Sequence, residues 1–232
     1  MQLSIKTSKG KYKYKFVPLF AGVKRINKDI AARNLIDFKA IMDSHGIVFC
    51  LAYGTLLGAV REKDFIAHDE DIDLIITGEY SQKLFDALCD FRKSGFEVCR
   101  YDRRGVISFM REGEYIDIYI FNPYQSKLLR CGREIIPAKY FKDITPLEFK
   151  GIMYNAPTDY AEFLTYYYGD NWGTPIQQFQ YEQPKWKKAI NLALQYFKEL
   201  LPDSLFFALV DIQDKKVRAD FLGRIASMEL DK

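Results

Sequence analysis

The chain has little of what usually holds soft metals. Two of its 232 residues are histidine and four are cysteine. The cysteines, which are Cys50, Cys89, Cys99 and Cys131, show no Cys-x-x-Cys spacing, and this argues against a zinc site. Cys50 and Cys89 lie within apolar patterns, so we expect both side chains to pack in the core.

The chain also lacks a large excess of positive or negative charge, and it lacks a long apolar run. The net charge is +3 without a clustered basic stripe, which argues against nucleic acid as a partner. The sequence shows no signal peptide and no apolar run of about 18 residues, which predicts a cytoplasmic protein in a reducing compartment. Lysines at positions 9, 11, 13 and 15 alternate with aromatic residues, which favours an edge strand with a solvated basic face. A basic patch for an anionic or lipid-linked acceptor is the alternative.

What is present predicts an α+β fold, with helices packed on a mixed sheet. Apolar residues make up 48% and charged residues 28%, as in an ordinary globular protein. Helical spacing places Ala31, Leu35, Phe38 and Met42 on one face. Ser81 is the expected cap of a second helix, and Asp159 begins a capping box for a third. Strands are predicted at Ile47–Tyr53, Phe96–Tyr101, Val106–Met110 and Tyr115–Phe121.

The C-terminal part is predicted to be helical. A helix after Pro184 carries Trp186, Ile190, Ala193, Phe197 and Leu201 on one face, and a later segment places Val217, Phe221 and Ile225 together. With lysines at its start, the first helix fits either docking on the core or peripheral membrane contact, and we expect docking. The sequence thus predicts a main domain over residues 1–180 and a helical extension over residues 181–232 packed on it.

The strongest chemical signal is a group of acids at the start of an apolar strand. Asp69, Glu70, Asp71 and Asp73 fall within five residues and run into Leu74-Ile75-Ile76. Carboxylates this close repel one another, and a hard cation such as Mg²⁺ is the usual reason for tolerating them. In a strand alternate residues share a face, so Asp71 and Asp73 point the same way.

A third carboxylate lies in another apolar strand. Asp117 is flanked by isoleucines in Tyr115–Phe121, where a lone buried acid needs a partner or a metal ion. On a strand adjacent to the first it would complete a three-oxygen site with Asp71 and Asp73. A surface acid on a half-exposed sheet face is the alternative. We therefore predict that Asp71, Asp73 and Asp117 form a metal-binding catalytic triad.

These motifs together resemble the LicD branch of the nucleotidyltransferase superfamily. The resemblance covers roughly residues 25–175 and is carried by Gly54–Arg61, Asp64–Ile66, Asp69–Asp73, Ile136–Pro137 and Tyr166–Pro175. Two positions depart from the usual motif, since His68 replaces an aromatic residue and Glu70 interrupts a run of Asp. Both positions concern substrate choice. His68 either contacts or orients the substrate, or it is a packed histidine.

The resemblance implies a nucleotidyltransferase-like catalytic domain over residues 1–180 and a transferase that uses Mg²⁺, or alternatively Mn²⁺. Members of this branch move a phospho-alcohol, such as phosphocholine, from a CDP-activated donor to a glycan hydroxyl in cell-surface polysaccharide biosynthesis. The implied partners are such a donor and a glycan or lipid-linked glycan acceptor. A nucleotidyltransferase that places a nucleoside monophosphate on a small molecule or RNA stays open, as does a catalytically silent scaffold.

The resemblance also implies roles for individual residues. The stretch Gly54–Arg61 is predicted to be a glycine-rich turn. Its Gly54 and Gly58 would let backbone N–H groups approach the donor phosphates, and Thr55 would add a hydroxyl donor. Arg61 would pair with a phosphate, or structurally with an acid that follows it in sequence. Asp117 would ligate the ion nearer the acceptor hydroxyl and take its proton. The aromatic rings of residues 166–172 would stack a sugar or cage an ammonium group, or pack in the core.

Overall fold

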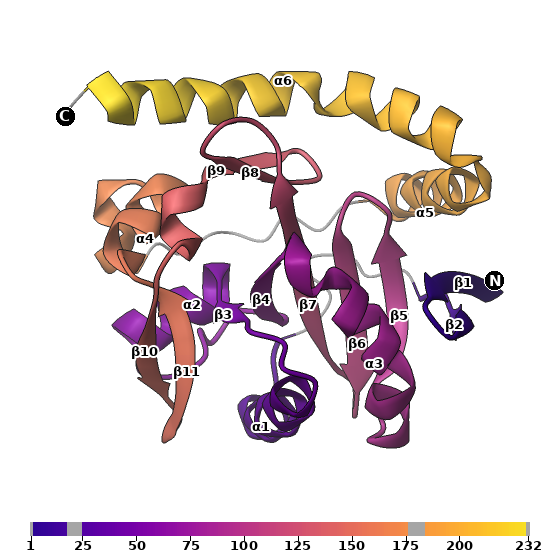
Figure 1. Cartoon of the computed structure of the whole chain (residues 1–232), viewed down its shortest axis with the longest axis horizontal. Coiled ribbons are helices and arrows are strands. Elements are labelled where there is room, and N and C mark those ends of the chain that lie inside the picture. The colour runs from indigo at the N-terminus through magenta and orange to yellow at the C-terminus, as the bar shows by residue number, and fades with distance from the viewer. Residues whose placement is uncertain (1, 18–24, 176–183, 231–232) are drawn as a thin grey trace.

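A computed structural model describes residues 2–17, 25–175 and 184–230. Its main feature is a nine-stranded mixed sheet in which seven strands follow the order β10-β11-β3-β4-β7-β6-β5, while β8 and β9 continue from β7 (Figure 1). The strands are β3 Cys50–Leu51, β4 Ile72–Thr77, β5 Glu97–Asp102, β6 Val106–Arg111, β7 Glu114–Pro123, β8 Leu128–Cys131, β9 Glu134–Pro137, β10 Ile144–Phe149 and β11 Ile152–Pro157. A separate hairpin joins β1, Gln2–Thr7, to β2, Gly10–Lys15. The predicted α+β class with a mixed sheet is confirmed.

Helices cover the sheet and continue beyond it. They are α1 Lys28–Ser44, α2 Tyr53–Arg61, α3 Ser81–Lys93, α4 Tyr160–Tyr168, α5 Lys185–Leu200 and α6 Asp203–Leu230, with short 3₁₀ turns at Gly78–Tyr80, Ala138–Phe141 and Asp170–Gly173. The face predicted for α1 is confirmed, because Ala31, Leu35, Phe38 and Met42 are all buried. In the hairpin, the lysines of β2 face solvent while Tyr12 and Tyr14 are buried.

Strand alternation separates an apolar face from a polar one. The rings of Phe38 in α1 and Phe91 in α3 both contact Phe109 of β6, with ring centres 5.2 and 4.8 Å away. Phe109 pairs with Ile116 of β7, so Ile116 lies on the face of the sheet that the two helices cover. The residue that follows Ile116, Asp117, must then point to the opposite face. The fold keeps the acid out of the aromatic core in this way.

The glycine-rich stretch that we predicted as a turn is a helix. The strand before it is only Cys50–Leu51, and α2 begins at Tyr53. The helix forms because Thr55, Leu56, Leu57 and Ala59 are all buried against the sheet and its neighbours. Gly54 and Gly58, four residues apart, share one face of this helix, where the loop of residues 64–69 crosses closely.

Three further local predictions are wrong. Ser81 does not cap α3, because it is already the first helical residue and its hydroxyl donates to the Gly78 carbonyl at 2.7 Å. Asp159 precedes α4, but its side chain makes no capping bond. Cys89 is exposed rather than in the core, since α3 buries its neighbours Leu88 and Phe91 on another face.

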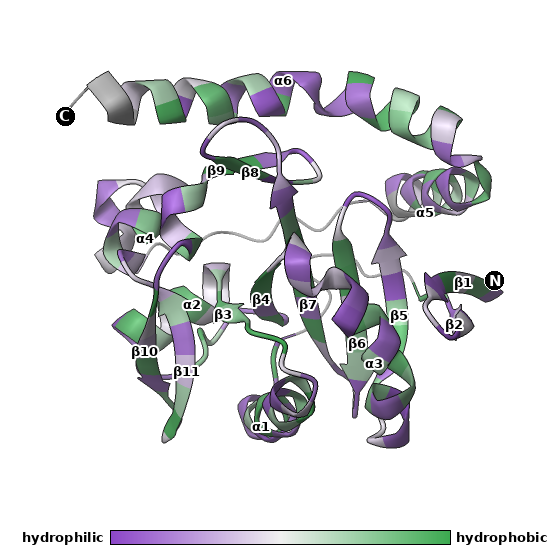
Figure 2. Ribbon diagram, in the orientation of Figure 1, coloured by the Kyte–Doolittle hydropathy of each residue, from purple (hydrophilic) through white to green (hydrophobic). Residues whose placement is uncertain are grey.

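The two C-terminal helices behave differently from each other. α6 packs across β9 and buries Phe206, Val210 and Ile225, as predicted for the face that holds Ile225 (Figure 1). Asp214 of α6 is buried and pairs with Arg104 at 3.0 Å. α5 instead exposes Trp186, Ile190 and Phe197 of the apolar face that we expected to dock on the core. Figure 2 colours hydrophobic residues of this helix green. That part of the docking prediction is wrong because α5 packs through its other side.

None of the helices in the described part of the chain is both long and apolar enough to cross a bilayer.

Truncation after Gln183 should give poorly folded protein. It removes the three apolar side chains that α6 buries, at about 1.5–3 kcal/mol each, which is comparable with the roughly 5–15 kcal/mol that stabilises a domain. It also leaves Arg104 without Asp214. Soluble yield and thermal melting measure the effect. The control is Ile212→Ser, at a position 78% exposed, which should melt like the wild type. A truncated chain that melts at the wild-type midpoint would show that the extension is dispensable.

Candidate functional site

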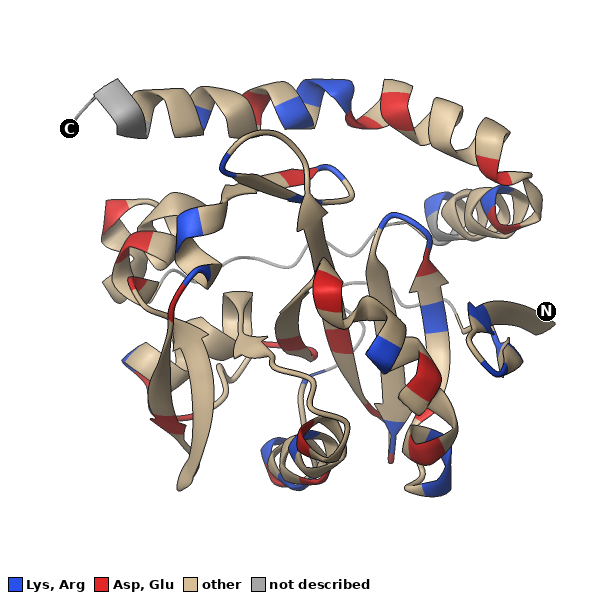
Figure 3. Cartoon of the chain, in the orientation of Figure 1, with Lys and Arg blue, Asp and Glu red and all other residues tan. Residues whose placement is uncertain are grey.

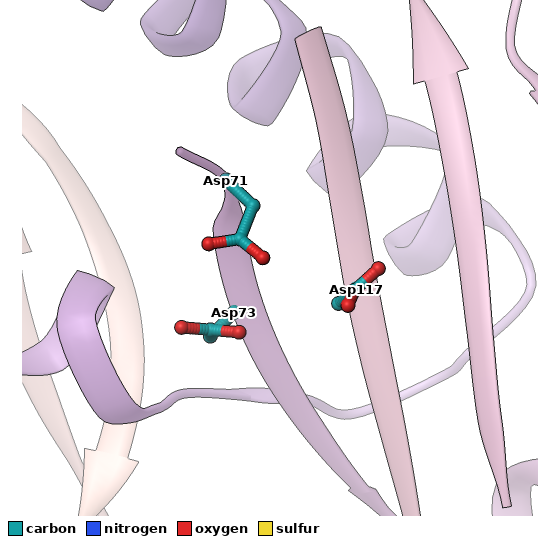
Figure 4. Close-up of side chains that lie close together, drawn as sticks. All are labelled: Asp71, Asp73 and Asp117. Atoms are coloured by element: carbon teal, nitrogen blue, oxygen red, sulfur yellow. The ribbon is translucent and has the colours of Figure 1, made fainter. Parts of the chain in front are cut away.

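Three acidic side chains converge on the polar face of the sheet. β4 and β7 are parallel, and their register places Asp73 directly beside Asp117. Asp71 lies two residues before Asp73 and points to the same side, as Figure 4 shows. One carboxylate oxygen from each of the three lies within 4.8 Å of the others. The prediction that Asp117 lies on a strand adjacent to that of Asp73 is therefore correct.

A basic residue that the sequence analysis missed continues this row across the sheet. Asp117 pairs with Ser108 of β6, and Ser108 pairs with Arg100 of β5. The Arg100 guanidinium donates to Asp117 Oδ2 at 2.5 Å and to Ser108 Oγ at 2.9 Å. The sequence did contain a sign of this row, because Arg100 and Ser108 are polar residues within two predicted strands that are otherwise largely apolar. Arg100 holds Asp117 in one orientation and leaves its other oxygen free.

Two of the acids at this site each have a buried carboxylate oxygen without a hydrogen-bond partner among the described residues. They are Asp117 Oδ1 and Asp69 Oδ2. A buried, unpaired carboxylate oxygen is costly, and a bound cation is one way to satisfy it. Oxygen ligands alone are what hard divalent cations such as Mg²⁺ prefer. The donor set of Asp71, Asp73 and Asp117 is thus compatible with a divalent metal ion.

Burial raises the pKa of these acids, and neighbouring carboxylates add to the shift for Asp71 and Asp73. Burial, followed by the charges of Asp117 and Asp69, raises the pKa of Asp71 from 3.8 to about 8. Burial raises the pKa of Asp69 to about 6. The pKa of Asp73 is also raised, by burial and by the neighbouring Asp71. For Asp117, burial raises the pKa and Arg100 opposes the shift. Without a cation these carboxylates therefore repel one another.

The N-terminal part of α2 is fixed against the acids. The buried Thr55 hydroxyl accepts a hydrogen bond from the Asp73 backbone N–H at 2.9 Å, which joins the helix to β4. Gly54 faces the Asp69 carboxylate, and there is no space for a side chain between them. At Gly58, a Cβ would lie 2.5 Å from the Asp64 carbonyl oxygen. The glycines therefore have a packing role, while the predicted contact of this segment with phosphates stays a prediction.

Arg61 and His68 line the same cleft as the acids. The Arg61 guanidinium donates to the Trp172 carbonyl at 3.2 Å and to Glu62 at 2.7 Å. The structural pairing considered from the sequence is thus present, although Arg61 Nε has no partner among the described residues. His68 is an exposed residue of the cleft wall and not a core residue.

The cleft has a volume of about 710 Å³ and combines acids, cations and aromatic rings. Besides Asp69, Asp71 and Asp117, its walls include Gly54, Arg61, His68, Arg100, Arg133, Tyr115, Tyr119, Tyr168 and Trp172. Thr55 and Gly58 lie behind these walls. The aromatic run is divided between two places, since Tyr168 and Trp172 face the cleft while Tyr166 is buried and donates to the Ile135 carbonyl at 2.6 Å.

Comparison with known proteins gives relatives for the part of the chain that holds this cleft. The mouse (Mus musculus) ribitol-5-phosphate transferase FKTN is 25% identical over 165 residues, covering 66% of this chain and 34% of that protein. The mouse ribitol 5-phosphate transferase FKRP is 26% identical over 148 residues, covering 56% and 29%. An uncharacterized protein of Rickettsia prowazekii is 27% identical over 160 residues, covering 66% and 53%. The chain thus spans about a third to a half of the length of the curated relatives it matches.

Among solved structures, the antibiotic-resistance factor ANT(2'')-Ia in solution aligns at 17% identity and a TM-score of 0.48, covering 87% of this chain and 96% of that one. The lincosamide antibiotic adenylyltransferase LnuA aligns at 14% identity and a TM-score of 0.43, covering 57% and 83%. The model of the LicD/FKTN/FKRP nucleotidyltransferase domain matches residues 46–159, which include all three acids and α2, while the aromatic run after Tyr166 lies beyond it. This part of the chain, residues 46–159, is therefore similar to the nucleotidyltransferase domain of the LicD/FKTN/FKRP family.

Proposed function

We propose that the chain is a metal-dependent transferase that moves a phospho-alcohol group from a CDP-activated donor to a glycan hydroxyl. The observation that carries this proposal is the convergence of Asp71, Asp73 and Asp117 within a region similar to the LicD/FKTN/FKRP domain. Asp71 and Asp117 also line the cleft. The names of the curated relatives support the phospho-alcohol class, since FKTN and FKRP are ribitol-5-phosphate transferases. Phosphocholine and ribitol phosphate are both candidates for the transferred group.

Asp71, Asp73 and Asp117 would hold Mg²⁺, with Mn²⁺ as the alternative. Bound there, the ion would neutralise charge on the phosphates of the donor and lower the pKa of the acceptor hydroxyl. The unpartnered Oδ1 of Asp117 supports this assignment because that oxygen is buried and free to act as a ligand or to accept a proton. Arg100 then acts as a positioning residue, since it holds the other oxygen of the same carboxylate.

The remaining polar groups of the cleft would bind the donor. The first N–H groups of α2 have no partner within the helix, and a helix N-terminus favours an anionic ligand. Gly54 keeps this end of the helix free of a side chain. Arg61, held by Glu62 and Trp172, presents a fixed guanidinium to a phosphate. Tyr168 and Trp172 would pack against the alcohol or sugar portion.

The donor class is tested by offering a panel of CDP-linked alcohols, including CDP-choline and CDP-ribitol, with and without glycan from cells. The proposal expects Mg²⁺-dependent release of CMP that increases when an acceptor is present. The alternative, transfer of a nucleoside monophosphate, predicts that label from an α-labelled nucleoside triphosphate enters the product. Labelled product from the triphosphate, with no CMP from any CDP-alcohol, would replace our proposal with that alternative.

Replacing any one of the three proposed ligands should lower CMP release by at least about a hundredfold, because groups that hold one ion act as a unit. The variants are Asp71→Asn, Asp73→Asn and Asp117→Asn. Asp69→Asn should cost less, since Asp69 is not one of the three ligands. Asp90→Asn, on the exposed side of α3, is the matched control and should keep full turnover. Steady-state rates at saturating Mg²⁺ give the comparison, and wild-type turnover by Asp117→Asn would remove this residue from the site.

The repulsion among the acids predicts an unusual stability change. In chelator, Asp73→Asn should be more stable than the wild type by about 0.5–2 kcal/mol, because it keeps the shape and removes one charge. Mg²⁺ should raise the wild-type melting midpoint and leave the variant nearly unchanged. Thermal melts with EDTA and with Mg²⁺ measure both effects. Acids that act only as structural partners would give a variant that melts below wild type, with no shift on adding Mg²⁺.

Burial of the acids and the repulsion between them make the stability of the metal-free chain depend on pH. Since folding raises the pKa of Asp71 from 3.8 to about 8, the folded state binds this proton more tightly than the unfolded state. Its stabilising contribution is complete below about pH 4 and is lost as pH rises to about 8. In EDTA, wild type should therefore melt higher at pH 6 than at pH 8, and saturating Mg²⁺ should reduce the difference. Equal melting midpoints at pH 6 and pH 8 in EDTA would contradict the raised pKa of Asp71.

A further inference from the structure

The outer face of α5 is apolar and has no partner within the described part of the chain. Trp186, Ile190, Leu194, Phe197 and Leu200 recur every three or four residues and are 62%, 51%, 50%, 55% and 70% exposed. The inner side of the helix holds it in place, because the Tyr196 ring meets Phe16 edge-on at 5.3 Å. Arg103 also donates to the carbonyl of Lys198, at 2.7 Å. The helix is therefore attached to the protein through one side and turns its largest apolar side chains to solvent.

This apolar surface continues into the next helix. α6 begins three residues after α5 ends, and its first turns expose Leu205 and Ile212, the latter by 78%. Figure 2 shows hydrophobic residues on α5 and on the adjoining part of α6. Exposed apolar side chains gathered on two successive helices mark an interaction site. We call these seven residues, five on α5 and two on α6, the outer apolar surface.

Lysines border the outer apolar surface, and the nearby acids are already engaged. The Lys187 ammonium lies 5.4 Å from the centre of the Trp186 ring. Lys198, about three helical turns later, is half-buried and donates to Gln213 Oε1 at 2.9 Å, and on α6 Lys215 and Lys216 follow Ile212 and are exposed. None of these four lysines forms an ion pair with a residue that the structure describes. Figure 3 shows the basic residues along both helices.

The acidic residues of this region face inward or pair with arginines. Asp203 pairs with Arg103 at 2.7 Å, and Asp211 pairs with Arg218 at 2.7 Å. Glu199, the one carboxylate in the sequence of α5, is half-buried and lies within the electrostatic influence of Arg103. The border of the outer apolar surface therefore presents positive charge that the protein itself does not neutralise.

We propose that the outer apolar surface lies in the headgroup region of an anionic lipid bilayer, with the bordering lysines on lipid phosphates. An amphipathic helix with Trp, Phe and Leu on one face and lysines beside it has the composition of interfacial helices. Lysine stems can lie along the apolar boundary while the ammonium groups reach the anionic headgroups. This inference does not depend on the proposed transferase activity.

A second copy of the chain is a less suitable occupant. A two-fold contact places the same surface on both sides, so the lysines of one copy would meet those of the other. The acids that could neutralise them are paired with arginines, as described above. An anionic bilayer supplies the missing negative charge and accepts the apolar side chains at the same time.

The test measures co-sedimentation of the full chain with vesicles. One set is phosphatidylcholine alone and the other contains one quarter phosphatidylglycerol. The proposal expects binding to the anionic vesicles at least about tenfold tighter than to the neutral ones, and weaker binding as salt rises. Equal binding to both sets would contradict the charge part of the proposal. Absence of binding to either set would overturn it.

Matched variants locate the contact. Ile190→Gln with Phe197→Gln should lower vesicle affinity at least about tenfold, and Trp186→Ser alone should lower it severalfold. Because all three side chains are exposed, the variants should melt like the wild type. The control variant, Ile36→Gln with Met153→Gln, replaces two exposed apolar residues on α1 and β11 and should leave vesicle affinity unchanged. Lys187→Glu with Lys216→Glu should abolish the preference for anionic vesicles.

Two results would assign the surface otherwise. Equal vesicle binding by the wild type and by both apolar variants would place the membrane contact elsewhere on the chain. Failure to bind vesicles, together with a concentration-dependent dimer in sedimentation equilibrium that Ile190→Gln with Phe197→Gln disrupts, would assign the surface to self-association.

Discussion

Electrostatic repulsion among carboxylates is the constraint on which the arrangement of the cleft depends. The register of β4 and β7 places Asp73 beside Asp117 on a largely buried sheet face, and Asp71 joins them. Burial raises the pKa of all three, and repulsion by neighbouring acids adds to the shift for Asp71 and Asp73, so the folded chain holds these groups in an unfavourable state without a cation. Only a rigid surrounding structure can keep them together. Thr55 supplies part of it by fixing α2 to β4, and Arg100 supplies another part by orienting Asp117.

The sequence alone was enough to predict the three carboxylates at the centre of this arrangement. Strand periodicity alone placed Asp71 and Asp73 on one face, and the isolated Asp117 in an apolar strand pointed to a neighbouring position on the sheet. The resemblance to the LicD branch came from the same motifs, and the family match over residues 46–159 confirmed it. Such short-range patterns are informative because an acidic residue within an apolar strand is costly to bury and therefore needs a specific partner.

Features that depend on long-range packing were not predictable. Nothing in the sequence analysis identified the strands between residues 128 and 157, which are short and contain prolines at 137, 146 and 157. The Gly54–Arg61 segment was expected to be a turn, because the close approach of residues 64–69 that requires its glycines involves the tertiary fold. Arg100 is an ordinary basic residue until β5 and β6 align it with Asp117. The direction of the apolar face of α5 likewise depended on the contact of Tyr196 with Phe16.

Divalent-cation binding tests the central claim most directly, because it separates the role of the acids from any assumption about the substrate. Titration with Mn²⁺, followed by the loss of its free electron paramagnetic resonance signal, measures occupancy without requiring turnover. The account predicts saturable binding by the wild type, competition by Mg²⁺, and loss of that binding in Asp117→Asn, whose thermal melt shows that it is folded. Wild-type Mn²⁺ affinity in folded Asp117→Asn, or no saturable binding by the wild type, would contradict the assignment of the three carboxylates as a metal site.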